Sequence, residues 1–293
     1  MTIRQRPILV TGGSGQVGGA VARLAAARGV DAYAPPRAQL DLCDADALRA
    51  IVASRPWQAI INCAAYTAVD KAESEPDLAH RINAEAPTAL AVAAAKADIP
   101  IIHVSTDYVF DGSKIGAYTP DDPVGPLGVY GQTKLAGEAG VAAGNPRHAI
   151  VRTAWVLSAS GSNFLNTMLR LGADRPEMRV VADQRGNPTS ADDIAAALLT
   201  VVDQLGTRSG TWHFVNDGAA SWHDLAAHIF AATAARGLPT PTLTPITTAD
   251  YPTPARRPAN SQLSTATLTR DFGIVPRAWQ HAVDDILSAR LDR

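Results

Sequence analysis

Short apolar runs alternate with longer alanine-rich stretches through the first half of this chain, and this alternation restricts its fold more than any other feature. The run Ile8–Thr11 precedes the helix-like stretch Val17–Arg28, and Ala59–Cys63 precedes Leu78–Ala97. Strands separated by helices of this length form βαβ units, and hence a parallel sheet with helices on both faces. The continuous apolar triplet Ile8-Leu9-Val10 fits a strand buried on both faces. The pattern therefore predicts an α/β fold with a doubly wound parallel sheet.

The remaining elements follow the same alternation up to Thr153 and a looser pattern beyond it. We expect further strands at 31–34, 101–105, 149–153, 179–182 and 212–215, and further helices at 44–54, 130–143, 163–171 and 191–204. Another helix begins at Ser221, with Asp224 placed to complete a capping box. The segment Leu238–Pro258 contains six prolines, so we expect a long ordered loop or an excursion at a sheet edge.

Composition excludes several classes of protein. Hydrophobic residues make up 46% of the 293 residues, which is enough for a substantial core. Lys and Arg number 26 against 28 Asp and Glu, and the resulting net charge of −2 argues against a nucleic-acid partner. The two cysteines, Cys43 and Cys63, are too few for a disulfide scaffold and are expected to be small buried side chains. We find no signal peptide and no apolar run near the roughly 18 residues of a membrane span, and expect a cytoplasmic protein.

A glycine-rich turn, Thr11-Gly12-Gly13-Ser14-Gly15-Gln16-Val17-Gly18, joins the first strand to the first helix. Its glycines let backbone amides approach a pyrophosphate, and the helix N-terminus favours negative charge. Such a turn alone is weak support, but in the first βα unit of a doubly wound sheet it favours a dinucleotide. The turn lacks the Gly-Lys-Ser/Thr ending of a nucleoside-triphosphate loop. The expected cofactor contacts are Gly12, Ser14, Gly15, Gln16, Val17 and Gly18.

The ends of the second and third strands indicate where the rest of the cofactor lies. After the second strand comes Arg37 rather than an acidic residue, so this place favours the 2′-phosphate of NADPH; NADH stays open, because an arginine here can simply be solvated. Asp41 is a candidate for the adenine edge, and Asp44 is expected to cap the next helix. Small residues after the third strand let the cofactor lie close, and the expected contacts at both strand ends are Asp41, Leu42, Cys63, Ala64, Ala65 and Tyr66.

Tyr130 and Lys134 stand four residues apart on an expected helix, so their side chains share one face. A lysine ammonium stabilises a tyrosinate, so we expect it to lower the pKa of the phenol and make Tyr130 a proton donor to a carbonyl oxygen. Chance also produces Tyr-x-x-x-Lys pairs. Thr106 ends the fourth strand at the edge where open α/β sheets bind ligands, and can donate a second hydrogen bond to that oxygen. Together the three residues predict a carbonyl-reducing site.

Long strings of residues resemble the extended short-chain dehydrogenase/reductase family over nearly the whole chain. They are the glycine turn and residues 62–73, 104–112, 130–134, 152–156, 183–189 and 257–261. The resemblance is strongest to the branch that reduces the 4-keto group of dTDP-4-dehydro-6-deoxy-L-mannose to give dTDP-L-rhamnose. It implies a catalytic set of Thr106, Tyr130 and Lys134 working with NADPH or NADH, a dTDP-4-dehydro-6-deoxy sugar as the substrate, and leaves a homodimer open.

The resemblance also implies where the substrate binds and how the chain is divided. The residues implied at the sugar and its nucleotide are Thr67, Val69, Thr106, Asp107, Tyr108, Trp155, Asn163, Arg256 and Arg257. A strand-end tryptophan can equally belong to the core, and a basic pair can be solvated. We expect an NAD(P)-binding Rossmann domain of residues 1–157 plus 190–220, and a smaller nucleotide-sugar-binding domain of residues 158–189 plus 221–293.

Two features depart from the family pattern, and two other functions stay open. Some members bridge a dimer through magnesium with a glutamate after the glycine turn, but Gly18-Gly19-Ala20-Val21 has no carboxylate, so we expect no metal there. Ser264 stands where an aspartate is common. A dehydratase or epimerase of the same superfamily is the first alternative; dehydratases carry a glutamate after the aspartate, but Tyr108 follows Asp107 here, which favours simple reduction. A non-catalytic NADP-sensing subunit could lose Tyr130 or Lys134, and this chain keeps both.

Overall fold

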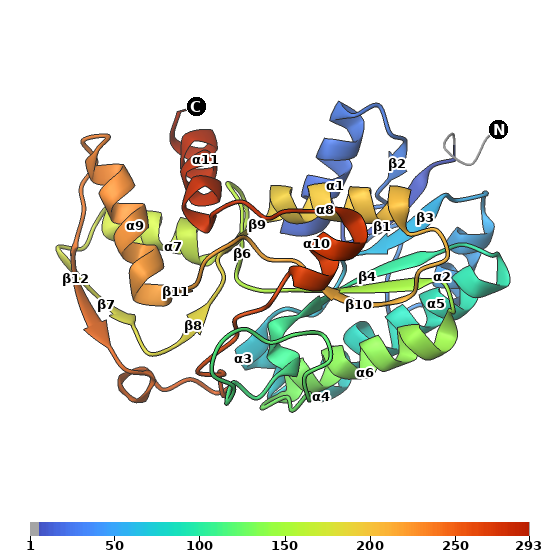
Figure 1. Cartoon of the computed structure of the whole chain (residues 1–293), viewed down its shortest axis with the longest axis horizontal. Coiled ribbons are helices and arrows are strands. Elements are labelled where there is room, and N and C mark those ends of the chain that lie inside the picture. Colours follow the sequence, from blue (N-terminus) through green and yellow to red (C-terminus); the bar gives the residue numbers. More distant parts are fainter. Residues whose placement is uncertain (1–5, 293) are drawn as a thin grey trace.

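A six-stranded parallel sheet forms the centre of the protein, in a computed structural model that describes residues 6–292 (Figure 1). Its strand order is β10-β5-β4-β3-β1-β2. The strands are β1 (Ile8–Thr11), β2 (Ala32–Tyr33), β3 (Ala59–Asn62), β4 (Ile101–Thr106), β5 (His148–Thr153) and β10 (Gly210–His213). The predicted doubly wound α/β fold is confirmed.

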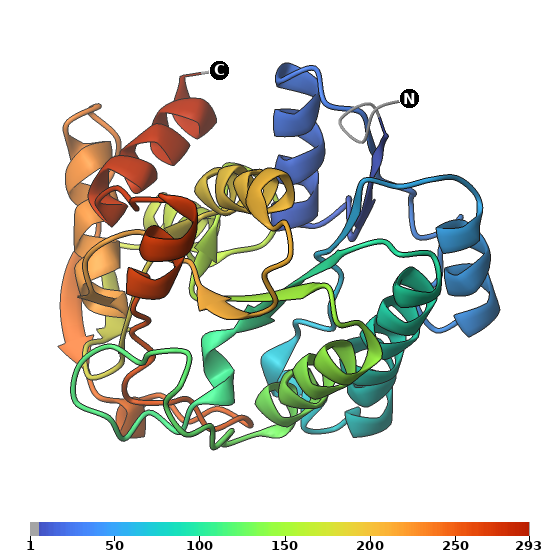
Figure 2. The ribbon, with the colours of Figure 1, turned by 45° about the vertical axis from the view of Figure 1, so that its right-hand side comes forward.

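Helices cover both faces of this sheet, because each presents an apolar side to it. One face carries α1 (Gln16–Ala27), α8 (Ala191–Gln204) and α10 (Ala266–Phe272), which pack on the strands through side chains such as Val21, Ile194 and Leu268. The other face carries α2 (Ala45–Ala53), α5 (Ala86–Lys96) and α6 (Val129–Gly144), with Leu48, Leu90 and Val141 in the interface. Figure 2 shows α1 and α8 on the opposite side of the sheet from α5 and α6.

The single helix predicted over Leu78–Ala97 is divided into three pieces. They are α4 (Pro76–His80), the π-helical turn η2 (Arg81–Glu85) and α5. Pro87 has no N–H to donate to the carbonyl of Asn83, so the regular α-helical bond is lost at this point. Gly137 of α6 packs directly on that carbonyl: a Cβ there would lie 2.0 Å from the Asn83 oxygen. The break therefore lets α6 lie close against this helix.

A second group of elements lies beside the sheet, on the left of Figure 1. Its helices α7 (Phe164–Gly172), α9 (Trp222–Ala234) and α11 (Trp279–Leu291) share a core that includes Leu165, Ile229 and Val283. Three two-stranded pairs complete it: β7 (Glu177–Val181) with β12 (Thr242–Ile246), β8 (Arg185–Gly186) with β11 (Ala220–Ser221), and β6 (Val156–Leu157) with β9 (Thr189–Ser190). The short turns are α3 (Val69–Ala72), η3 (Asp107–Val109) and η4 (Thr248–Asp250).

Several local predictions from the sequence are confirmed and two helices were missed. The capping box of α9 forms: Ser221 Oγ accepts from Asp224 N at 3.0 Å, and Asp224 Oδ2 accepts from Ser221 N at 2.9 Å. The proline-rich segment is an edge excursion, because it supplies β12 with Pro245 inside it. Sequence reasoning did not predict α10 and α11, which follow this segment.

Within residues 6–292 no helix combines the length and the apolar character needed to cross a bilayer. The prediction of no signal peptide falls in part on residues 1–5, which lie outside the described residues.

Candidate active site

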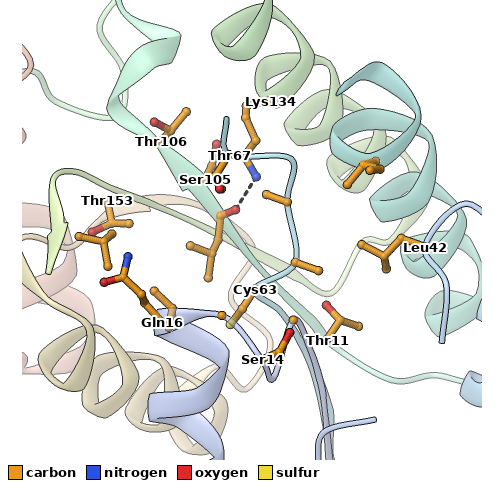
Figure 3. Close-up of a pocket in the computed structure, with 18 of the residues that line it drawn as sticks. Thr11, Ser14, Gln16, Leu42, Cys63, Thr67, Ser105, Thr106, Lys134 and Thr153 are labelled. Carbon is orange, nitrogen blue, oxygen red and sulfur yellow. Dashed lines mark hydrogen bonds between the residues drawn. The ribbon is translucent and has the colours of Figure 1, made fainter. Parts of the chain in front are cut away.

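A cavity of about 680 Å³ opens along the carboxyl ends of the parallel strands, where open α/β sheets bind ligands (Figure 3). Its size lies within the range of small-molecule and cofactor sites. The glycine turn after β1 lies at one end and the strand ends of β4 and β5 at the other. The lining residues that the sequence predicted are Gly12, Ser14, Gly15, Gln16, Val17, Arg37, Asp41, Leu42, Cys63, Ala64, Ala65, Thr67, Val69, Thr106, Asp107, Tyr108, Tyr130, Lys134 and Trp155.

The glycine turn is shaped so that larger residues would not fit. Gly12 has a φ of +71°, and a Cβ on it would lie 2.7 Å from the backbone nitrogen of Ala64. Gly18 is outside the lining and packs beneath the turn, where a Cβ would lie 2.3 Å from the Gly12 oxygen. The cavity is lined by Gly12, Ser14 and Gly15, which lie just before the N-terminus of α1. This cradle fits the pyrophosphate of a dinucleotide.

The part of the cavity after β2, on the other side of the glycine turn from β4 and β5, has the residues expected for an adenosine. Arg37 is exposed and borders the cavity with Leu42. Asp41 also borders it, and its Oδ1 accepts from Cys43 N at 3.0 Å. Asp44 caps α2 as predicted, since its Oδ1 accepts from the backbone of Asp46 and Ala47 at 3.0 Å each. Among residues 6–292 the Arg37 side chain has no hydrogen-bond or ion-pair partner, so its guanidinium can face a ligand phosphate.

Small residues after β3 form the middle of the cavity, but the neighbouring tyrosine faces elsewhere. Cys63, Ala64 and Ala65 line the cavity. Tyr66 is outside the lining: its hydroxyl donates to Glu75 Oε2 at 2.7 Å. The predicted contact of Tyr66 with the cofactor has no support in this arrangement of its side chain.

Two cavity residues that sequence reasoning missed carry unpaired polar atoms. Ser105 Oγ and Thr153 Oγ1 are buried without a hydrogen-bond partner among the described residues, and both residues line the cavity. Buried polar groups are nearly always paired, so these hydroxyls suit a polar ligand. They stand at the carboxyl ends of β4 and β5, and the position of ligands at strand ends was the signal that could have found them.

The side chains of Thr106 and Tyr130 lie next to each other at the carboxyl end of β4. Thr106 Oγ1 donates to Asp107 Oδ1 at 2.9 Å and accepts from Tyr108 N at 3.2 Å. Burial raises the pKa of Tyr130 to about 12, although a hydrogen bond with the Thr106 side chain acts in the opposite direction. The expected lowering of this pKa by the lysine was wrong for the structure as it stands, because burial dominates. Tyr130 therefore holds its proton near neutral pH.

Lys134 is buried in α6 with only 2% of its surface exposed. Its Nζ donates to the backbone oxygen of Val104 at 2.7 Å, the contact drawn as a dashed line in Figure 3. Nζ also lies 3.4 Å from Nε2 of His103. Burial lowers the pKa of Lys134 to about 8, with Glu138 and Cys63 raising it. The side chain is thus a cation that loses its proton more readily than an ordinary lysine.

The carboxylate beside the threonine is perturbed as well. Asp107 is buried, and burial raises its pKa to about 6. The ring of the next residue, Tyr108, lies edge-on to Tyr130 with centroids 5.5 Å apart. Within residues 6–292 no group of three or more His, Cys, Asp and Glu residues is arranged to hold a metal ion.

An aromatic wall closes the cavity beyond the catalytic residues. Trp155 lines the cavity and stacks on Trp222 with ring centroids 3.5 Å apart and planes 5° apart. Its φ of +44° is uncommon for a residue other than glycine. The ring also needs Gly186, where a Cβ would lie 2.5 Å from it. Trp155 is therefore held rigidly, at a place where a sugar ring could lie.

Three predicted substrate residues are outside the lining. Asn163 caps α7, and its Nδ2 donates to Gln16 Oε1 at 2.8 Å, so it links the second group of elements to the glycine turn. Arg257 is paired with Asp70 at 2.8 Å. Arg256 is exposed. These residues reach a ligand only if it extends past the cavity.

Comparisons with known proteins agree with this geometry. The family model described as RmlD substrate binding domain matches residues 6–291. A dTDP-4-dehydrorhamnose reductase of Sinorhizobium fredii is 43% identical over 290 residues, covering 97% of each chain. The crystal structure of a dTDP-4-dehydrorhamnose reductase from Clostridium acetobutylicum has a TM-score of 0.92 and 39% identity, covering 97% of this chain and 99% of that one. A Bacillus anthracis dTDP-4-dehydrorhamnose reductase solved in complex with NADP has a TM-score of 0.91 and 31% identity, with the same coverage.

Proposed function

This chain belongs to the RmlD family, the dTDP-4-dehydrorhamnose reductases among the extended short-chain dehydrogenases/reductases, and we propose that it uses NADPH to reduce the 4-keto group of dTDP-4-dehydro-6-deoxy-L-mannose. The product is dTDP-L-rhamnose, and the reaction is the last step in its synthesis. The observation that carries the proposal is one cavity that joins the glycine cradle to Thr106, Tyr130 and Lys134.

The cavity fits a nicotinamide dinucleotide, which supplies a hydride to the keto carbon when it is bound. Gly12 and Ser14 would hold its pyrophosphate through backbone N–H groups, whereas the Gly15 N–H already donates to the Gly12 oxygen at 2.9 Å and closes the turn. Arg37 would pair with a 2′-phosphate, and its place in the lining together with the NADP of the Bacillus anthracis relative supports NADPH over NADH. The unpaired hydroxyls of Ser105 and Thr153 would gain partners from the ligand.

The catalytic side chains divide the acid–base work. Tyr130 keeps its proton at neutral pH and gives it from Oη to the sugar oxygen as negative charge develops there. The Thr106 hydroxyl, which donates to Asp107 Oδ1 in the structure, would turn to donate a second hydrogen bond to the same oxygen. The Lys134 ammonium, one turn later on α6, would stabilise the phenolate that forms on Tyr130. With Tyr130 protonated and Lys134 charged at neutral pH, the site can donate a proton to the keto oxygen.

The sugar and its nucleotide would lie between the catalytic residues and the aromatic wall. Thr67, Val69 and Tyr108 border this part of the cavity, and Trp155 would orient the sugar ring. Asp107, Asn163, Arg256 and Arg257 stay proposed contacts. The division into residues 1–157 plus 190–220 for the cofactor and 158–189 plus 221–293 for the nucleotide sugar is likewise part of this proposal.

An assay of NADPH and NADH oxidation with the 4-keto sugar tests the function. We expect oxidation with the sugar and a rate loss of about 10²–10⁴-fold in Tyr130→Phe, the usual effect of removing a general acid. Tyr33→Phe is the control, because that hydroxyl contacts Gln39 outside the cavity. Unchanged turnover in Tyr130→Phe would show that another group is the acid. Tightly held NAD without net oxidation would instead indicate an epimerase or dehydratase, and NADP binding without reduction a regulatory subunit.

A further inference from the structure

A line of buried polar side chains runs beneath the cavity and ends at the catalytic lysine. Thr11 of β1 donates its hydroxyl hydrogen to Oδ1 of Asn62 in the adjacent strand β3. Nδ2 of Asn62 lies 2.9 Å from Nδ1 of His103 in the next strand, β4. Nε2 of His103 lies 3.4 Å from Nζ of Lys134. All four side chains are buried, and the chemistry proposed above uses only the last of them.

These contacts determine which ring nitrogen of His103 carries the proton. The Asn62 oxygen accepts from Thr11, so its NH₂ group faces His103 and donates to Nδ1. Nδ1 must then present its lone pair. Burial and the nearby Lys134 charge hold the pKa of His103 well below its ordinary value, so the ring is neutral. The single ring proton is therefore on Nε2, directed at Lys134.

A ring N–H facing Nζ acts differently on the two forms of the lysine. An ammonium has only donors, whereas a neutral amine has a lone pair that accepts from an N–H. The Lys134 ammonium donates a hydrogen bond to the backbone oxygen of Val104, at the shorter distance of 2.7 Å. The contact at 3.4 Å therefore becomes a proper hydrogen bond only when Lys134 has lost a proton.

We propose that His103 is a positioning residue that acts through Lys134: its Nε2–H, fixed by Asn62 and Thr11, stabilises the uncharged amine and so eases release of the lysine proton. The inference rests on the proposed function, in which the Lys134 ammonium supports Tyr130 during reduction. It assigns a function to three side chains that the proposed chemistry does not use, of which Thr11 also lines the cavity. It also predicts that the pH at which activity falls depends on the hydrogen-bond direction along this line.

Other titratable groups also surround Lys134. Glu138 lies one turn later on α6 and raises the pKa of Lys134, but its carboxylate is paired with Arg152 of β5. Burial raises the pKa of the Cys63 thiol to about 12, so it is uncharged near neutrality.

Tyr130 lies one turn earlier on α6, and Asp107 in η3 acts on its pKa. The π-helical turn η2 contacts α6 through the uncharged amide of Asn83. His103 thus differs from the charged neighbours of Lys134: they act on the lysine through their charge, whereas His103 acts through the direction of its hydrogen bond.

The first variant is chosen to reverse that direction without adding charge. In Thr11→Val the Asn62 amide is free to turn, so that its oxygen accepts from Nδ1–H and the Nε2 lone pair accepts from the ammonium. We expect the basic limb of the kcat/KM pH profile, near the Lys134 pKa of about 8, to move up by about one pH unit. Asn62→Asp requires Nδ1–H and also adds a buried carboxylate that favours the ammonium, so it should move the limb further in the same direction. Thr233→Val, the same change at a buried threonine of α9, should leave the limb in place.

Nitrogen-15 NMR of the imidazole in the unmodified enzyme gives a second readout that needs no substrate. We expect a neutral His103 ring with hydrogen on Nε2. Hydrogen on Nδ1, or a basic limb that stays fixed in both Thr11→Val and Asn62→Asp, would overturn the proposal. If the unmodified enzyme fails to reduce the sugar, the proposed function is wrong, and the NMR result still decides the tautomer by itself.

Discussion

Arg257 holds Asp70 through both carboxylate oxygens, at 3.0 Å from Nη1 to Oδ1 and 2.8 Å from Nη2 to Oδ2. Asp70 lies in α3 next to Val69, which lines the cavity, whereas Arg257 comes from the proline-rich loop after η4. The guanidinium lowers the pKa of Asp70, so the carboxylate is charged at neutral pH. This pair fastens the C-terminal loop beside the sugar end of the cavity.

Breaking that pair should weaken substrate binding more than catalysis. In Arg257→Ala, and in Asp70→Asn, we expect the KM for the dTDP sugar to rise about tenfold, equivalent to ~1.4 kcal/mol, with a smaller change in kcat. The reason is that Val69 and the loop lose a bidentate contact that orders them. Steady-state kinetics measure both constants. Arg270→Ala, which breaks the pair of an exposed arginine with the half-buried Asp271, is the control, and a normal KM in Asp70→Asn would contradict the ordering role.

Removing Arg37 should change the choice of cofactor. We expect Arg37→Ala to raise the KM for NADPH about tenfold and to leave that for NADH nearly unchanged, because only NADPH has a 2′-phosphate for the guanidinium to meet. Initial rates with each cofactor at saturating sugar give the two constants. Arg28→Ala removes an exposed arginine outside the cavity lining and should alter neither. Equal increases for both cofactors would show that Arg37 contacts a group they share.

The charge on the buried Lys134 should lower the free energy of unfolding below pH 8. Lys134 has a pKa of about 8 in the folded protein against an ordinary 10.5, so the unfolded chain binds more protons between these values and stability rises with pH across that window. We expect Lys134→Met to be inactive yet more stable at pH 7, on the order of 2 kcal/mol, with the gain shrinking towards pH 10.

Urea unfolding at several pH values measures this gain. Lys96→Met, at an exposed position of α5, should show no pH-dependent gain. A difference between Lys134→Met and the unmodified protein that stays constant with pH would rule out the lysine charge as its cause.

The buried ion pair between β5 and α6 should be sensitive to loss of one partner. Arg152 contacts Glu138 at 2.7 Å and 2.9 Å, with 6% and 5% of the two side chains exposed. Arg152→Met leaves a carboxylate buried without its partner, and we expect a loss of about 3–5 kcal/mol in the free energy of unfolding.

The double variant Arg152→Met/Glu138→Leu should recover part of that loss, because it removes the unpaired charge. Arg23→Met breaks the exposed pair with Asp192 and should cost under about 1 kcal/mol. Denaturant unfolding compares all three, and a double variant as unstable as Arg152→Met would contradict the explanation.

The α/β class, the glycine turn and most element positions could be predicted because they depend on neighbours in the chain. A run such as Ile8–Thr11 is a buried strand through its own side chains, and Ser221 caps a helix through a residue three positions away. The break at Pro87 was readable in principle but was passed over, since the apolar spacing continues across it. The helix α10 was missed after a segment dominated by prolines.

The sequence by itself determined that strands and helices alternate, that a glycine turn opens the first helix, and that Tyr130 and Lys134 share a helical face. Only the tertiary structure decided the protonation chemistry. Burial raises the pKa of Tyr130, where spacing predicted a decrease, and the packing of β4 against α6 brings His103 next to Lys134. It also decided that Arg257 pairs with Asp70. Spacing along a chain sets local conformation, but desolvation and long-range hydrogen bonds depend on which elements pack together, and that information is spread over the whole fold.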